Sequence, residues 1–175
     1  MNYDIIVIGS GPGGYVTAIR ASQLGLKIAV VERDSLGGIC LNWGCIPTKA
    51  LLKSANVFEY IQHASDYGIT VKDSKADFGG MVDRSRGVAN GMSQGIQFLM
   101  KKNKIDVIKG TGVLKAGKKV AVTGEDGKVT EYTADKGVII ATGARSRQLP
   151  NLPQDGSKII GYREAMSMKT QPKKM

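Results

Sequence analysis

Cysteine is scarce in this sequence, which has 175 residues but only two cysteines, Cys40 and Cys45. Because there are so few, a fold held together by a disulfide framework is excluded, and the C-x4-C spacing differs from the C-x2-C of thioredoxin-like proteins. Two sulfurs without nearby histidines also make a poor zinc site. In a reducing compartment such a pair is more often a transient, catalytic disulfide than a structural one.

Long apolar runs and aromatic residues are also scarce. No run approaches the ~20 residues of a membrane-spanning helix, and no basic segment precedes an apolar one at the N-terminus. We therefore expect a cytoplasmic protein with neither a membrane anchor nor a secretory signal. The net charge is +10, but aromatic residues make up only 6% and the lysines are scattered. This favours a solvated basic surface, or a fragment of a longer chain with compensating acidic residues, over nucleic-acid binding.

The first 35 residues predict two strands with a helix between them. The run "DIIVI", Asp4 to Ile8, is typical of a buried parallel strand, and "KIAVVE" predicts a second strand that ends at Glu32. Between them, "YVTAIRASQL" has helical spacing, and Gly25 suits the end of that helix. This β-α-β order predicts an α/β fold of the Rossmann type.

The turn between the first strand and the helix is rich in glycine. Gly9, Gly11 and Gly14 form the pattern G-x-G-x-x-G. Gly9 permits a tight turn, Gly11 lets the backbone approach a pyrophosphate, and Gly14 lets the helix pack closely on the strand. The helix N-terminus can bind phosphates through its N–H groups, and Glu32 can accept hydrogen bonds from ribose hydroxyls. The sequence therefore predicts a dinucleotide-binding site.

The segment "GGICLNWGCIPTKALL", residues 37–52, contains both cysteines and the only tryptophan. On a regular helix, Cα atoms at i and i+5 lie roughly 8 to 9 Å apart, whereas a disulfide needs less than ~7 Å. An irregular turn is therefore expected, in which Gly44 supplies backbone freedom and Pro47 disfavours helical geometry at Ile46. We expect a distorted helix start with both sulfurs at its N-terminal end, where the helix dipole favours thiolate.

This segment resembles the redox-active disulfide segment of the flavoprotein disulfide reductases, and it is most similar to that of the dihydrolipoamide dehydrogenases. Glutathione and mercuric reductases share the frame GG-x-C-x-N-x-G-C but tend to differ where this chain has "IPTKALL". The resemblance implies that Cys45 lies against a flavin ring as a charge-transfer thiolate and that Cys40 exchanges with the substrate. It also implies that Lys49 lies near the reactive edge of the flavin. Trp43 stands where valine is common, either as a shield for the disulfide or as plain packing.

The rest of the chain predicts further elements of the same fold. A long helix is expected over residues 80–102, and His63 is expected on the surface rather than in catalysis. A strand in "IDVIKGTGVL" leads to Gly112, and Asp126-Gly127 predicts a hairpin within a small antiparallel sheet. A separate buried strand, Val138 to Ala141, opens into "ATG". The apolar stripe of the long helix is predicted to consist of Met81, Val88, Met92, Ile96, Leu99 and Met100.

The resemblance implies an FAD-binding fold, truncated here, with a parallel sheet flanked by helices and a small antiparallel β-meander. Gly112 is expected to contact the adenine ring, and the "ATG" backbone is expected near the flavin. No metal site is expected. The residues expected to bind FAD are Gly9, Gly11, Pro12, Gly13, Gly14, Glu32, Arg33, Gly38, Lys49, Gly112, Thr142 and Gly143.

The resemblance covers the whole chain but only about the first third of a full family member. We expect residues 1–149 to form the N-terminal part of the FAD-binding domain and residues 150–175 to lead toward an NAD-binding domain. A full family member is a homodimer that oxidises dihydrolipoamide on a lipoyl domain of a 2-oxo acid dehydrogenase complex. Electrons pass through the cysteine pair and FAD to NAD+.

The catalytic base and the NAD site of such an enzyme lie outside this chain, so the isolated chain is not expected to complete turnover. Two alternatives remain open at this point. The chain is the same portion of a glutathione or mercuric reductase, or it is a non-enzymatic flavin-binding or thiol-redox adaptor.

Overall fold

The computed structural model describes residues 1–175, and the chain divides into two compact units. The first unit comprises Met1–Asn42 and Gly91–Arg145, and the second comprises Trp43–Asn90 and Ser146–Met175. The first unit contains every named strand, whereas the named elements of the second unit are helices. No helix combines the length and the apolar character that crossing a membrane requires.

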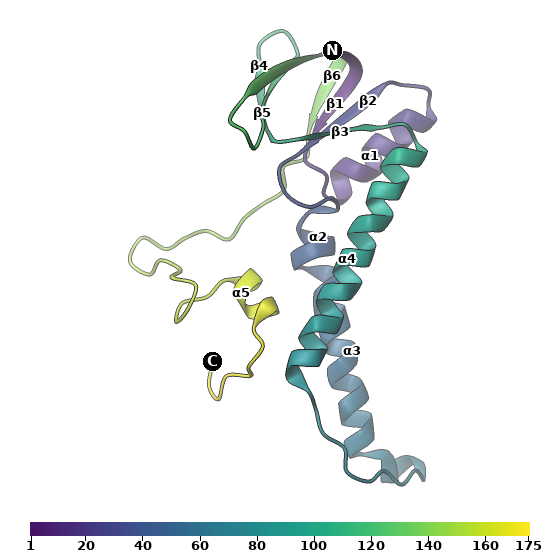
Figure 1. The fold of residues 1–175 in the computed structure, drawn as a ribbon, viewed down its shortest axis with the longest axis vertical. Coiled ribbons are helices and arrows are strands. Elements are labelled where there is room, and N and C mark those ends of the chain that lie inside the picture. Colours follow the sequence, from purple (N-terminus) through teal and green to yellow (C-terminus); the bar gives the residue numbers. More distant parts are fainter. The chain divides into compact units, whose positions relative to one another are not determined.

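The first unit is built on a mixed six-stranded sheet (Figure 1). Its order is β3-β2-β1-β6-β5-β4, in which β3, β2, β1 and β6 are parallel and β6, β5 and β4 pair antiparallel. The strands are β1 (Asn2–Ile8), β2 (Ile28–Glu32), β3 (Asp106–Lys109), β4 (Thr111–Lys115), β5 (Lys119–Thr123) and β6 (Val129–Ile140). Helix α1 (Pro12–Gln23) connects β1 to β2 and packs against both. The predicted α/β fold with a parallel sheet and an antiparallel meander is confirmed.

Strand β6 corrects one prediction, because the sequence suggested two separate strands where the structure has one. Its first part pairs antiparallel with β5, and its second part pairs parallel with β1. The register along β1 shifts between Tyr3 and Ile5, which lie opposite Ala134 and Gly137. One extra residue of β6 is therefore accommodated as a bulge, so that "DKG" continues the strand instead of turning it.

The parallel strands bring several loops to one edge of the sheet. Strands β1, β2 and β6 all run in the same direction and end at Ile8, Glu32 and Ile140. Beneath this edge lies an apolar core cluster of Tyr3, Ile6, Ile8, Ala29, Val31, Val120, Val122 and Ala134. Ligands of open α/β sheets bind at the carboxyl ends of the strands, so this edge is the place to look for a nucleotide site.

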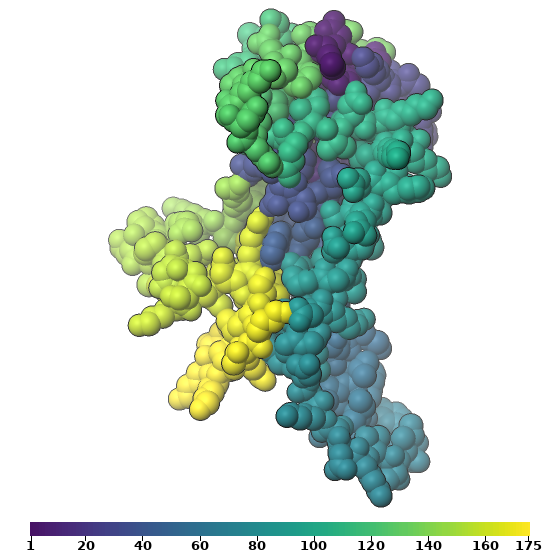
Figure 2. Space-filling view, viewed as in Figure 1, coloured from purple at the N-terminus to yellow at the C-terminus, as the bar shows by residue number.

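The second unit contains α3 (Cys45–Gln62), the short 3₁₀ helix η1 (Ala64–Tyr67), the first half of α4 (Phe78–Lys102) and α5 (Tyr162–Ser167). Helix α3 and this half of α4 lie side by side (Figure 1), and the Arg84 guanidinium donates to the Ala50 carbonyl at 3.0 Å. The C-terminal segment lies against α4 (Figure 2), where Lys169 pairs with Asp83. The unit is therefore a helix pair with an attached irregular segment.

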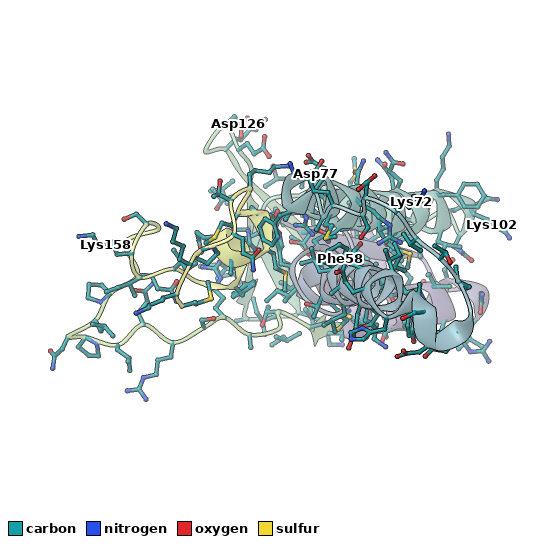
Figure 3. The ribbon with its side chains drawn as sticks, turned by 90° about the horizontal axis from the view of Figure 1, so that it is seen from below. Phe58, Lys72, Asp77, Lys102, Asp126 and Lys158 are labelled. Carbon is teal, nitrogen blue, oxygen red and sulfur yellow. The ribbon has the colours of Figure 1, made fainter.

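Helix α4 begins two residues before its predicted start, because Asp77 caps it. The carboxylate of Asp77, a residue labelled in Figure 3, accepts a hydrogen bond from the Gly80 amide at 3.0 Å. The predicted apolar stripe is partly wrong, since Val88 and Met92 are 38% and 42% exposed. The buried positions of α4 are Val82, Ser85, Ala89, Ile96 and Met100. Two of these are small residues, which a search for large apolar side chains passes over.

His63 follows the last residue of α3 and is exposed, as predicted for a surface residue. Its Nδ1 lies 2.9 Å from the Glu59 carbonyl oxygen, one turn earlier in α3. The ring is therefore engaged with the end of its own helix.

Candidate functional site

The chain from the end of β1 into the first turn of α1 is packed so tightly that Gly9 and Gly14 have no room for a side chain. A Cβ on Gly9 would lie 2.3 Å from the Ala141 carbonyl oxygen, and one on Gly14 would lie 1.9 Å from the Gly9 carbonyl oxygen. Gly9 also has a φ of +100°, which favours glycine. These contacts are those expected of a tight turn and of a helix that packs closely on its strand.

The start of α1 is open, in contrast to the turn before it. Gly11 is the N-cap residue and supplies no side-chain cap. Pro12 and Gly13 are exposed, and a Cβ on Gly13 would meet nothing within 4 Å. The first turn therefore combines accessible backbone with the positive end of the helix dipole, which suits an anion such as a phosphate group.

Glu32 ends β2, and the protein surrounds its carboxylate with hydrogen-bond donors. Oε2 accepts from the Ser10 amide at 2.9 Å and from the Ser10 hydroxyl at 2.7 Å. Oε1 accepts from the amides of Arg33 and Asp34 at 2.8 and 2.9 Å. The carboxylate is thus held at the same edge as the glycine turn. Sequence reasoning did not single out Ser10, which is fully buried, although its place inside G-x-G-x-x-G could have drawn attention to it.

The beginning of the cysteine segment packs directly on the glycine turn. The Gly37 amide donates to the Ser10 carbonyl oxygen at 3.0 Å. Gly38 has a φ of +62°, and a Cβ there would lie 2.6 Å from the Gly11 Cα. Only glycine permits this approach, so Gly38 has a packing reason beside its predicted cofactor role. Gly37, with a φ of +96°, was missed by sequence reasoning although the doublet "GG" contains it.

Cys40 lies in α2 (Gly38–Trp43), which follows this contact, and its side chain is half-buried. The loop before α2 is fixed by Asn42, whose amide donates to the carbonyl oxygens of Leu36 and Gly38 at 2.9 and 3.0 Å. The Ser93 hydroxyl donates to the same Leu36 oxygen at 2.9 Å. Cys40 is therefore carried by the same unit as the glycine turn and Glu32.

Three further predicted residues lie in this unit. A Cβ on Gly112 would lie 3.1 Å from the nearest Val31 side-chain atom and 3.3 Å from the nearest Ile8 atom, so packing alone favours glycine there. Thr142 and Gly143 are exposed and follow β6, at the point where the Ala141 amide donates to the Ile8 carbonyl oxygen at 2.8 Å. All three thus lie near the carboxyl ends of the strands.

The geometry around the second cysteine differs from the expected distorted helix start. Two helices are present, because Gly44 interrupts them with the non-helical angles φ −147° and ψ −113°. Helix α3 begins at Cys45, so Ile46 is helical although it precedes Pro47. Pro47 lies in the first turn as predicted. Only Cys45 therefore lies at the N-terminal end of α3.

Cys45 and Lys49 are both exposed. Lys49 follows Cys45 by four residues within α3, so the two side chains lie on the same face one turn apart. The second unit thus presents a thiol and an ammonium group together to solvent.

Trp43, which ends α2, contacts two guanidinium groups of its own unit. The Arg86 and Arg163 Cζ atoms lie 4.4 and 5.0 Å from the centre of its ring, within the range of cation–π contacts. Burial lowers the pKa of Arg86. These contacts favour packing as the role of Trp43. Sequence reasoning missed both arginines, since nothing local signals that such distant segments meet.

The comparisons with known proteins match nearly the whole chain. The pyridine nucleotide-disulphide oxidoreductase family model matches residues 3–175. A dihydrolipoyl dehydrogenase of Zymomonas mobilis is 49% identical over 174 residues, which cover 99% of this chain and 37% of the relative. A dihydrolipoyl dehydrogenase of Rhizobium etli is 50% identical over 189 residues, which cover 99% and 39%.

A solved structure shows the same architecture. The crystal structure of LpdA from Mycobacterium tuberculosis matches with a TM-score of 0.84 at 26% identity, over 95% of this chain and 37% of that chain. The chain spans well under half the length of each of these three proteins. It belongs to the pyridine nucleotide-disulphide oxidoreductase family.

Proposed function

We propose that this chain is the FAD-binding, cysteine-bearing part of a dihydrolipoyl dehydrogenase. The observation that carries the proposal is the backbone contact of Gly38 with Gly11, because it joins the segment that bears Cys40 to a nucleotide-type glycine turn. The named relatives, at 49% and 50% identity, favour this assignment over the glutathione and mercuric reductases.

The residues of the first unit fit an FAD molecule. The exposed start of α1 would hold the pyrophosphate through its N–H groups, and Glu32 would accept a ribose hydroxyl. The Gly112 backbone would contact the adenine ring, and the exposed backbone at Thr142 and Gly143 would lie near the flavin. Bound FAD would supply two-electron acceptance from the cysteine pair and donation to NAD+.

The cysteines would exchange two electrons with a dithiol substrate. In the oxidised chain, a thiolate of dihydrolipoamide attacks the Cys40 sulfur, the Cys40–Cys45 bond breaks, and Cys45 leaves as a thiolate. The second substrate thiol, on losing its proton, attacks the substrate sulfur bonded to Cys40. Lipoamide is released as a disulfide, Cys40 leaves as a thiolate, and both substrate protons pass to a base.

Two groups of the second unit would stabilise the Cys45 thiolate. The N-terminus of α3 directs its positive dipole end toward Cys45, and Lys49 places a positive charge on the same helix face. The same lysine would lie near the reactive edge of the flavin, where its charge favours the reduced ring.

The remaining parts of the enzyme would lie outside these 175 residues. The chain contains one G-x-G-x-x-G motif, which the proposal assigns to FAD. Residues 1–149 would then form the N-terminal part of the FAD-binding domain, and residues 150–175 would lead toward a domain that binds NAD. The full protein would be a cytoplasmic homodimer whose substrate is dihydrolipoamide on a lipoyl domain of a 2-oxo acid dehydrogenase complex.

The visible absorption spectrum tests this function. The chain reconstituted with FAD is expected to show a bound flavin band that gains a long-wavelength charge-transfer shoulder after one equivalent of dithiol. Cys45→Ser should abolish the shoulder because it removes the thiolate that faces the ring, whereas Cys40→Ser should keep it. A protein that stays colourless after incubation with FAD, or a shoulder that survives in Cys45→Ser, contradicts the proposal.

A further inference from the structure

The Ser10 hydroxyl occupies an acceptor position on Glu32. Ser10 is 0% exposed, and its hydroxyl donates to Glu32 Oε2 at 2.7 Å. Three backbone amides donate to the same carboxylate: Ser10 at 2.9 Å, Arg33 at 2.8 Å and Asp34 at 2.9 Å. An ionised carboxylate offers about four lone-pair positions. Hydrogen-bond donors of the protein therefore occupy all four acceptor positions of the Glu32 carboxylate.

The four donors differ in their freedom to move. The three amides belong to the backbone of the glycine turn and of the residues that follow β2, and together they orient both carboxylate oxygens without help from a side chain. The Ser10 hydroxyl is the only one of the four that can turn away by rotation of a side chain alone. A ligand hydroxyl that donates to Glu32 must replace one donor, and this is the one that can leave without moving the backbone.

We propose that the Ser10 hydroxyl takes, in the absence of nucleotide, the position on Glu32 that a ribose hydroxyl takes in the complex. It fills the second acceptor position of Glu32 Oε2, which would otherwise keep the Ser10 amide as its donor. The Ser10 hydroxyl also competes with the ribose hydroxyl for Glu32. Ser10 is fully buried, so its hydroxyl has no water to bond once it turns away from Glu32. Ser10 thus sets how strongly the site depends on the ribose hydroxyls. This inference rests on the proposed role of Glu32 in FAD binding.

The test compares two ligands that differ only in the ribose. Binding of ADP and of 2′,3′-dideoxy-ADP to the full 175-residue chain is measured by calorimetry. The wild type should prefer ADP, because only ADP has hydroxyls that can donate to Glu32. Ser10→Ala keeps the amide donor and removes the competitor, so the ADP-to-dideoxy affinity ratio should rise about 3- to 10-fold.

Ser85→Ala is the matched control. Ser85 is the other fully buried serine, and its hydroxyl donates to the Val82 carbonyl oxygen at 2.7 Å, in the other unit. Loss of a buried hydroxyl in general would affect both variants, but only Ser10→Ala should change the ratio. Ser10→Gly also removes the hydroxyl and is expected to shift the ratio in the same direction if Ser10→Ala does not fold.

The other outcomes overturn either the inference about Ser10 or the proposed role of Glu32. An unchanged ratio in Ser10→Ala and Ser10→Gly, with ADP still preferred by the wild type, overturns the competition and leaves the FAD proposal intact. A lower ratio shows instead that the hydroxyl positions Glu32, and it overturns the inference as well. A wild type that does not prefer ADP to the dideoxy analogue overturns the proposed role of Glu32, and the inference fails with it.

Discussion

Tyr3 shows how one buried side chain can make the stability of the fold depend on pH. Its hydroxyl donates to Asp106 Oδ2 at 2.9 Å, and the residue is 3% exposed. Burial, followed by the hydrogen bond to Asp106 and its charge, raises the pKa of Tyr3 from 10.0 to about 12. The folded chain therefore holds the proton more tightly than the unfolded chain does.

From this shift we predict a loss of stability in alkali. The contribution of Tyr3 is fully present below pH 10 and is lost as the pH rises toward 12, with a loss of ~2 kcal/mol in the free energy of unfolding by the end of that range. Urea unfolding from pH 8 to 12 measures it. Tyr3→Phe should be ~1 kcal/mol less stable at neutral pH and should lack this part of the decline. Equal declines in both proteins would contradict the prediction.

Gly14 and Gly13 are adjacent glycines at the start of α1 with opposite surroundings. A Cβ on Gly14 would lie 1.9 Å from the Gly9 carbonyl oxygen, whereas one on Gly13 would meet nothing within 4 Å. Gly14→Ala should destabilise the chain by ~3 kcal/mol or more, because backbone must move. Gly13→Ala should change stability by no more than ~1 kcal/mol, and toward greater stability. Thermal unfolding of both variants checks this, and similar melting temperatures would refute it.

At the scale of the element, helix α4 contains glycines that packing does not explain. Gly87, Gly91 and Gly95 lie four residues apart in a helix of 25 residues, and a Cβ on each would meet nothing within 4 Å. Glycine in a helix interior costs ~0.5 to 1 kcal/mol relative to alanine. These positions weaken the helix without any compensating contact in the chain.

Gly91→Ala is therefore expected to stabilise the chain by ~0.5 to 1 kcal/mol, measured by chemical unfolding. Gly80→Ala is the contrasting variant in the same helix, because its Cβ would lie 2.7 Å from the Asp77 carboxylate that caps α4. That variant should lose part of the cap and be less stable by ~0.5 to 1 kcal/mol. Destabilisation by Gly91→Ala would show that this face of α4 has a close neighbour.

At the scale of the whole molecule, the proposed function makes a kinetic prediction. It assigns the FAD site and the cysteine pair to this chain and the other sites to the rest of a full enzyme. The purified 175-residue chain, supplied with FAD, dihydrolipoamide and NAD+, should form no NADH, because the proposed function assigns the base and the NAD site to residues outside this chain. Absorbance at the NADH band measures this, with an intact dihydrolipoyl dehydrogenase as the positive control. Measurable NADH formation that depends on Cys45 would overturn the prediction.

The sequence by itself determined those features that depend on near neighbours along the chain. The β-α-β order follows from apolar runs and from Gly9, Gly11 and Gly14, since a tight turn and a close helix contact need glycine at fixed spacing. The hairpin at Asp126-Gly127 has the same local origin, and Gly127 adopts a φ of +78°. The family resemblance also came from one continuous segment around Cys40 and Cys45.

The tertiary structure alone decided the features that join distant segments. Strand β6 continues without a turn because a bulge opposite β1 takes up its extra residue. Helix α3 begins directly after Gly44, so Ile46 is helical although the residue before a proline usually avoids helical angles. The hydrogen bond from the Ser10 hydroxyl to Glu32 joins residues that are 22 positions apart in the sequence. Local propensity acts over a few residues, whereas these contacts form only when separate strands and helices have packed. No short sequence pattern could therefore predict them.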